Sequence, residues 1–134
     1  MQDAERDVQA IAKGYTAAWN SGDPDQVAAF YTPEGALTIN GGEPSVGRVS
    51  VAEAARGFME AFPDLVLVND RLERSGDRIN YHWTFSGTNT GPGGTGRAVR
   101  FSGYESWILS DSGLIQDSLG SFDAEDYERQ LAGE

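Results

Sequence analysis

The sequence has 134 residues and no cysteine, and it carries 21 acidic against ten basic side chains, a formal net charge of −11. This length allows one domain with one core over residues 1–134, and the missing thiols exclude disulfides, thiol catalysis and cysteine-based zinc sites. The acidic charge argues against nucleic acids and anionic membranes as partners, because both bind basic surfaces. No apolar run reaches the length of a membrane span and the first residues are too polar for a signal peptide, so we expect a cytoplasmic protein.

Two helices are expected at the start of the chain. Apolar residues at helical spacing predict an amphipathic helix over about residues 3–20, with Tyr15 on its buried stripe. Asp23 is a typical cap for a second helix, and Pro24 occupies the favoured first position. We expect Pro33 to stop this helix, because proline cannot continue the hydrogen-bond pattern.

A short strand over residues 36–40 and a third helix follow. A cluster of glycine and proline turns the chain after the strand. Ser50 and Glu53 stand at the spacing of a capping box, which predicts the start of the helix. Phe58 lies on its apolar face, and Pro63 closes it.

The second half of the chain reads as a run of antiparallel strands. The expected strands cover residues 65–74, 78–85, 99–109 and 114–120, and Asp123 could cap a last short helix that reaches Leu131. Helices followed by strands predict an α+β fold, with the helices on one face of a curved sheet. A sheet that wraps in this way makes a cone whose mouth is a natural site for a small molecule.

Two acidic residues interrupt the apolar face of these strands. Alternation over residues 78–85 and 99–109 predicts one covered face, and Glu105 falls on that face. Asp117 takes the same kind of position between Ile115 and Leu119, although it could equally approach a sheet edge or pair with an arginine. A carboxylate buried without a partner is costly enough to shift its pKa or to recruit hydrogen-bond donors. The pattern therefore predicts a pocket with a polar floor.

Other polar features have simpler explanations. His82 is the only histidine, but its parity places it on the outer face of the sheet, in solvent or in a subunit contact. One histidine with scattered carboxylates offers no metal-ligand spacing, so we expect no metal. The glycine-rich stretch 91–96 lacks the ending of a phosphate-binding loop and joins two strands, so we interpret it as a flexible hairpin loop.

Two parts of the sequence resemble a known superfamily. Residues 14–23 (Gly-Tyr-Thr-Ala-Ala-Trp-Asn-Ser-Gly-Asp) and 30–36 (Phe-Tyr-Thr-Pro-Glu-Gly-Ala) look like the opening of nuclear transport factor 2-like proteins. Residues 83–91 (Trp-Thr-Phe-Ser-Gly-Thr-Asn-Thr-Gly), with 95–97 and 101–103, resemble the SnoaL-like branch, which includes polyketide cyclases. The resemblance implies a cystatin-like cone, formed by a curved antiparallel (mixed) sheet with three N-terminal helices packed on its concave face. It leaves function open, because this fold serves enzymes and non-catalytic domains alike.

The resemblance also suggests roles for individual residues. Ketosteroid isomerases, which are similar over the first helix and the Glu105 strand, use a tyrosine and a protonated acid as an oxyanion hole, and these positions are Tyr15 and Glu105 here. Their catalytic aspartate falls on Asn40. The histidine and acid associated with catalysis in SnoaL-like cyclases fall on Asn89 and Glu105.

These observations lead to two main hypotheses, and a third is a scaffold whose sheet face mediates assembly. In the first, the protein is a cofactor-independent isomerase or cyclase for a hydrophobic carbonyl compound, in which Tyr15 and Glu105 stabilise an enolate and Asp117, or a water held by Asn40 and Asn89, moves the proton. In the second, the cone binds a small apolar ligand without catalysis. The expected ligand-binding residues are Trp19, Asn40, Phe58, Trp83, Asn89, Phe101 and Trp107. We also expect a homodimer formed through the outer face of the sheet, where His82 and Tyr104 would lie.

Overall fold

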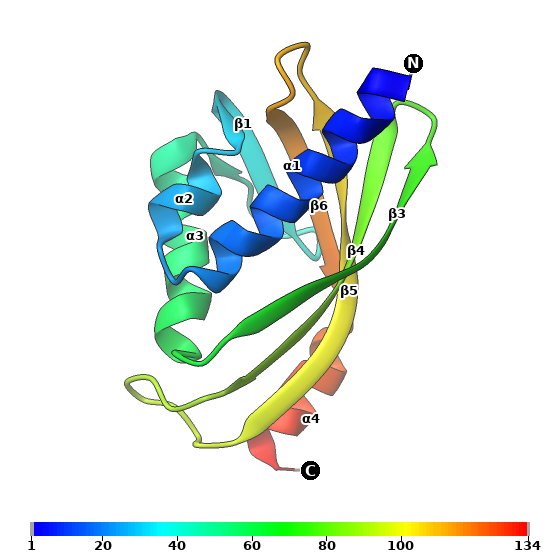
Figure 1. Cartoon of the computed structure of the whole chain (residues 1–134). Helices are drawn as coiled ribbons and strands as arrows, with labels where there is room; N and C mark the ends of the chain where they lie inside the picture. Colours follow the sequence, from blue (N-terminus) through cyan, green and yellow to red (C-terminus); the bar gives the residue numbers. More distant parts are fainter. Residues whose placement is uncertain (1, 134) are drawn as a thin grey trace.

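The chain forms one curved sheet covered by helices on its inner side (Figure 1). The structure is a computed structural model that describes residues 2–133, and the side chains from residue 8 onward. The helices are α1 (Gln2–Asn20), α2 (Pro24–Ala28), α3 (Arg48–Ala61) and α4 (Ala124–Ala132). The strands are β1 (Tyr31–Ile39), β2 (Ser45–Val46), β3 (Val66–Ser75), β4 (Arg78–Thr88), β5 (Ala98–Leu109) and β6 (Ile115–Phe122). None of the helices within residues 2–133 is long and apolar enough to cross a membrane.

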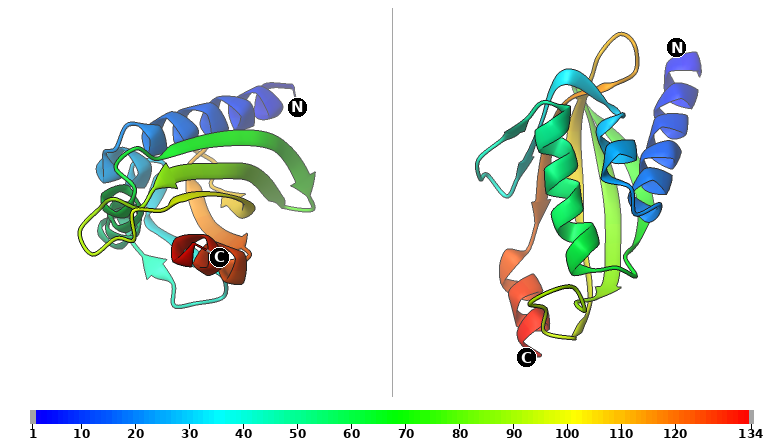
Figure 2. Two further views of the ribbon diagram at one scale, coloured as in Figure 1. Left: turned by 90° about the horizontal axis from the view of Figure 1, so that it is seen from below. Right: turned by 90° about the vertical axis from the view of Figure 1, so that its left-hand side faces the viewer.

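The sheet is mixed and has the order β2-β1-β6-β5-β4-β3. All neighbouring strands are antiparallel except β1 and β6, which run parallel. The sheet curls around α1, α2 and α3, and α4 lies within the curl at the other end (Figure 2). Tyr127 of α4 packs on Phe101 and Phe122, with ring centroids 4.9 and 5.7 Å apart. The expected α+β cone with three N-terminal helices is therefore confirmed, as is the last helix with Asp123 at its cap.

The alternation of β4 and β5 gives the sheet its two faces. The inward side chains of the two strands are buried, namely Ile79, Tyr81, Trp83, Phe85, Val99, Phe101, Glu105 and Trp107. Tyr81 lies opposite Glu105, and on the other face His82 lies opposite Tyr104. The predicted outward position of His82 is confirmed, and its Nε2 lies 2.6 Å from a carboxylate oxygen of Glu73.

Two predicted helix boundaries are wrong. Helix α2 ends at Ala28, and Pro33 lies inside β1, where the pairing with β6 is interrupted between Tyr31 and Ala36. Proline is tolerated there because an irregular stretch of strand needs no ladder hydrogen bond from every residue.

The predicted capping box of α3 is also absent. Helix α3 begins at Arg48, so Ser50 and Glu53 lie inside its first two turns. Gly47 takes the cap position with φ of 90°, a conformation that favours glycine, and no side chain caps the helix. The backbone hydrogen bond from Val51 N–H to Gly47 C=O starts the helix instead.

Asn20 joins the end of α1 to the edge strand β3. Its Nδ2 donates to the Leu67 carbonyl at 2.9 Å, and its Oδ1 accepts from the Leu67 N–H at 2.7 Å. This side-chain amide occupies the backbone groups that a further strand would use, and it holds the helix across the mouth of the sheet.

We expect Asn20→Ala to lower the free energy of unfolding by about 1–2 kcal/mol, because it leaves both backbone groups of Leu67 without their partner. Urea unfolding at neutral pH measures the change. Asn20→Asp keeps the acceptor, and at low pH its protonated carboxyl group also supplies an O–H donor, so its loss should be smaller there than that of Asn20→Ala. A stability of Asn20→Ala equal to that of the parent would contradict this role.

Candidate functional site

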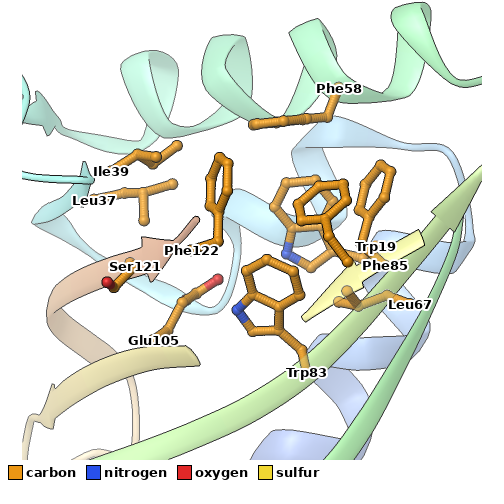
Figure 3. A pocket seen from close by; sticks show the side chains of 12 residues that line it. Trp19, Leu37, Ile39, Phe58, Leu67, Trp83, Phe85, Glu105, Ser121 and Phe122 are labelled. Carbon is orange, nitrogen blue, oxygen red and sulfur yellow. The ribbon is translucent and has the colours of Figure 1, made fainter. Parts of the chain in front are cut away.

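A small apolar cavity lies between the sheet and α3 (Figure 3). The residues that line it are Trp19, Leu37, Ile39, Phe58, Leu67, Trp83, Phe85, Phe101, Glu105, Gly120, Ser121 and Phe122. The cavity has a volume of about 60 Å³, counted as the space within which the centre of a water molecule can move. One water needs roughly 10–15 Å³ of such space, so the cavity holds several. Glu105 is the one acidic or basic side chain in this lining.

Three side chains hold the Glu105 carboxyl group. Its Oε1 accepts hydrogen bonds from Trp107 Nε1 at 2.9 Å, Ser118 Oγ at 2.8 Å and Tyr15 Oη at 3.0 Å. Among the side chains of residues 8–133, its Oε2 has one hydrogen-bond partner, the same Tyr15 hydroxyl at 3.2 Å. One oxygen is thus saturated by the protein and the other keeps capacity for a further hydrogen bond. In Figure 3 the carboxyl group points toward the space between Trp83 and Phe122.

Burial raises the pKa of the Glu105 carboxyl, because the apolar surroundings disfavour its charge. The hydrogen bonds from Trp107, Ser118 and Tyr15 act in the opposite direction by stabilising the carboxylate, but they only partly offset the burial. Such a group exchanges a proton nearer to neutral pH than an exposed glutamate does. A carboxyl group with a raised pKa in a cavity is a candidate for acid–base chemistry.

Tyr15 lies behind the carboxyl group and does not belong to the cavity lining. Its hydroxyl lies 2.9 Å from the Tyr31 hydroxyl, in addition to its contacts with Glu105. Burial raises the pKa of Tyr15 well above its usual range, and the nearby Glu105 adds to the shift. Tyr15 therefore stays protonated and supports Glu105, as its predicted place beside that residue implies.

The predicted inward position of Asp117 is wrong. Asp117 Oδ2 lies 2.7 Å from Arg78 Nη2 in a partly exposed ion pair, and it does not line the cavity. The cause is a break in the pairing of β5 and β6, where Ile108 faces Asp117 but the next residue, Leu109, faces Ile115. The extra residue reverses the alternation, so the fully buried Ser118 takes the inward position.

Asn40 and Asn89 hold the backbone and lie outside the cavity lining. Asn40 is exposed at the end of β1, and its Oδ1 accepts from the Phe122 N–H at 2.9 Å. Asn89 is buried, and its side chain bonds the Thr95 N–H at 2.8 Å and the Ala61 carbonyl at 3.2 Å. Their predicted contact with a ligand, directly or through a water, does not fit these positions.

The remaining predicted ligand contacts divide between the cavity and the core. Trp19, Phe58, Trp83 and Phe101 line the cavity. Trp107 is fully buried behind it, where it bonds Glu105 and stacks on Tyr81 with ring centroids 4.8 Å apart. Trp19 has a special feature: within residues 8–133 its Nε1 is a buried donor with no hydrogen-bond partner. An unpaired buried donor of this kind costs about 1–3 kcal/mol.

Sequence reasoning missed several lining residues. Leu37, Ile39 and Phe85 share the inward parity of their strands, so the alternation could have identified them. Phe122 and the Glu105 partner Ser118 could not be found in this way, because their direction depends on the break in pairing before β6.

No metal site is formed by the described part of the chain, since no three histidine or acidic side chains there come together. The cavity offers one carboxyl group among apolar walls, which is a poor set of ligands for a cation.

The fold and the site define a small α+β protein with an apolar cavity and one buried carboxyl group. A sequence model of the SnoaL-like polyketide cyclase family matches residues 9–131, so the chain belongs to that family. No curated protein sequence matches it.

Solved structures of similar proteins share the fold. TsrD from Streptomyces laurentii is 26% identical, with 96% of this chain and 97% of that chain covered and a TM-score of 0.80. A putative polyketide cyclase from Xanthomonas campestris pv. campestris is 20% identical, with 94% and 97% covered and a TM-score of 0.81. SalBIII, an epoxide hydrolase/cyclase-like enzyme of pyran ring formation in salinomycin, is 19% identical, with 94% and 97% covered and a TM-score of 0.79.

The raised pKa of Glu105 predicts how stability depends on pH. The folded protein holds a proton that the unfolded chain releases above the ordinary value of 4.5. The free energy of unfolding therefore falls as pH rises from 4.5 through the folded pKa. Relative to Glu105→Gln, the parent should lose about 1.4 kcal/mol for each unit by which the pKa is raised.

Urea unfolding of both proteins between about pH 4 and pH 8 tests this dependence. Subtraction of the two curves cancels the other titrating groups, because both proteins share them. A difference that does not change with pH would show that burial does not raise this pKa.

Proposed function

We propose that the protein is a cofactor-independent acid–base catalyst, an isomerase or a cyclase, for a hydrophobic carbonyl compound bound in the cavity. The observation that carries the proposal is Glu105, the one acidic or basic side chain of the lining, whose Oε2 keeps hydrogen-bonding capacity toward the cavity. Membership of the SnoaL-like polyketide cyclase family supports the same class of reaction.

Glu105 would move the proton by itself, since Asp117, Asn40 and Asn89 lie outside the lining. As a carboxylate it takes a proton from the carbon beside the carbonyl group: the C–H bond breaks, an O–H bond forms, and the electron pair moves to the carbonyl oxygen as an enolate. Return of the proton to another carbon of this system completes an isomerisation. Attack of the enolate carbon on a second carbonyl of the ligand closes a ring instead, and Glu105 then protonates the new alkoxide.

A second candidate function is binding without catalysis. It is favoured by the same lining, which holds no second group to share the proton transfer. The two functions differ at Glu105, because catalysis needs its carboxyl group whereas binding tolerates the amide of Gln.

We expect the protein to catalyse exchange of the hydrogens beside the carbonyl group of cyclohexanone in D₂O, measured by proton NMR. Glu105→Gln should lower the rate at least about 100-fold, because a positioned acid–base group contributes 10²–10⁴-fold. Gln still accepts the bonds from Trp107 and Ser118, so the fold should be kept, which circular dichroism checks.

Asp117→Asn is the matched control for this experiment. It removes a carboxylate on the outer side of the sheet, paired with Arg78, and should leave the exchange rate unchanged. Equal rates for the parent and Glu105→Gln would exclude the catalytic function at this residue, and the binding function would then lead.

We also propose that two copies associate through the outer face of the sheet. Apolar side chains are exposed there, among them Val68, Tyr104 and Leu119. Tyr104→Arg should shift the protein from dimer to monomer, because it puts a charged side chain into the apolar contact on both copies, and analytical ultracentrifugation measures this shift. A parent that sediments as a monomer would contradict the proposal.

A further inference from the structure

The group that donates a hydrogen bond to the ligand's oxygen is not the one that the family resemblance suggests. Tyr15 matches the oxyanion-hole tyrosine of ketosteroid isomerases, but its hydroxyl is engaged by Glu105 and Tyr31 and it does not line the cavity. A ligand oxygen in the cavity therefore needs another donor.

Trp19 supplies a donor without a partner. It lines the cavity, it is 7% exposed, and within residues 8–133 its Nε1 makes no hydrogen bond of normal geometry, although the indole lies near enough to the Tyr15 hydroxyl to act on the pKa of that group in the lowering direction. In Figure 3 the nitrogen lies on the side of the indole ring nearer to Glu105 and Trp83. An indole N–H only donates, so the partner it lacks is an acceptor such as a carbonyl oxygen. The atom is covered in this structure, so contact requires a small movement of the aromatic walls.

The walls limit the size and charge of the ligand. The space of about 60 Å³ is roughly four to six times what one water needs, which suits a single ring better than a polycyclic molecule. Apart from Glu105, Gly120 and Ser121, the lining side chains are aromatic or aliphatic, so a charged ligand would lose its hydration without compensation.

We propose that the Trp19 indole N–H binds the carbonyl oxygen of the ligand, and that this ligand is an uncharged, monocyclic ketone or aldehyde. The inference rests on the proposed function: Glu105 takes the proton from the carbon beside the carbonyl group, and Trp19 binds the oxygen of that same carbonyl group. Trp19 then stabilises the negative charge that develops on the oxygen while Glu105 takes the proton.

Indole NMR on protein labelled with ¹⁵N-tryptophan tests this assignment directly. The probes are cyclohexanone and methylenecyclohexane, which has the same ring with CH₂ in place of the oxygen. Trp→Phe variants assign the three indole signals of Trp19, Trp83 and Trp107. We expect cyclohexanone to move the Trp19 indole proton downfield and methylenecyclohexane to leave it nearly unmoved. A Trp19 signal that stays in place while cyclohexanone shifts Trp83 would overturn the assignment, and failure of both probes to bind would overturn the proposed ligand class.

Binding measurements on Trp19→Phe and Trp83→Phe give an independent check. Trp19→Phe should weaken the binding of cyclohexanone about tenfold relative to the binding of methylenecyclohexane, because one uncharged hydrogen bond is lost. Trp83→Phe is the matched control, since it changes the wall and should affect both probes alike. An unchanged preference in Trp19→Phe would contradict the role.

The two proposals fail separately. If cyclohexanone shifts Trp19 but its hydrogens do not exchange, the catalytic function fails and the Trp19 assignment holds. If exchange proceeds in Trp19→Phe with unchanged KM and kcat, the catalytic function holds and the Trp19 assignment fails.

Discussion

The hydrogen bonds to Glu105 are the interaction on which the site depends. They join α1, through Tyr15, to two strands from the other end of the chain: β5, through Trp107, and its neighbour β6, through Ser118. A buried carboxyl group is tolerated only when donors satisfy it or when it takes up a proton. Here both effects operate, because the donors saturate one oxygen while burial raises the pKa. The same contacts fix the direction of the carboxyl group and the packing of helix on sheet.

The residues that hold Glu105 are different from those that would contact a ligand. Tyr15, Trp107 and Ser118 stand behind Glu105, whereas apolar side chains and the Trp19 indole lie around the free space. Two asparagines, to which the family resemblance assigns the positions of catalytic groups, bond the backbone instead: Asn40 extends the contact of β1 with β6, and Asn89 holds the loop after β4. The proposed proton transfer therefore depends on fewer residues than the resemblance suggests.

The cavity also explains the composition of the inner face. A fully apolar core of this size would pack without a gap, as protein interiors usually do. Aromatic rings that meet edge to face, such as Trp19 with Phe58 and Trp83 with Phe101, surround the cavity together with Glu105. The volume between them sets the size of the molecule that can enter.

Local pattern by itself determined the α+β class, the inward faces of β4 and β5, the outward His82 and the inward position of Glu105, because side-chain alternation continues along an unbroken strand. The tertiary structure decided the rest. One extra residue in β6 exchanged the directions of Asp117 and Ser118, and the irregular pairing of β1 with β6 absorbed Pro33 into a strand. Such breaks depend on which strands pair and in what register, and the sequence of a single segment does not show which strand it pairs with.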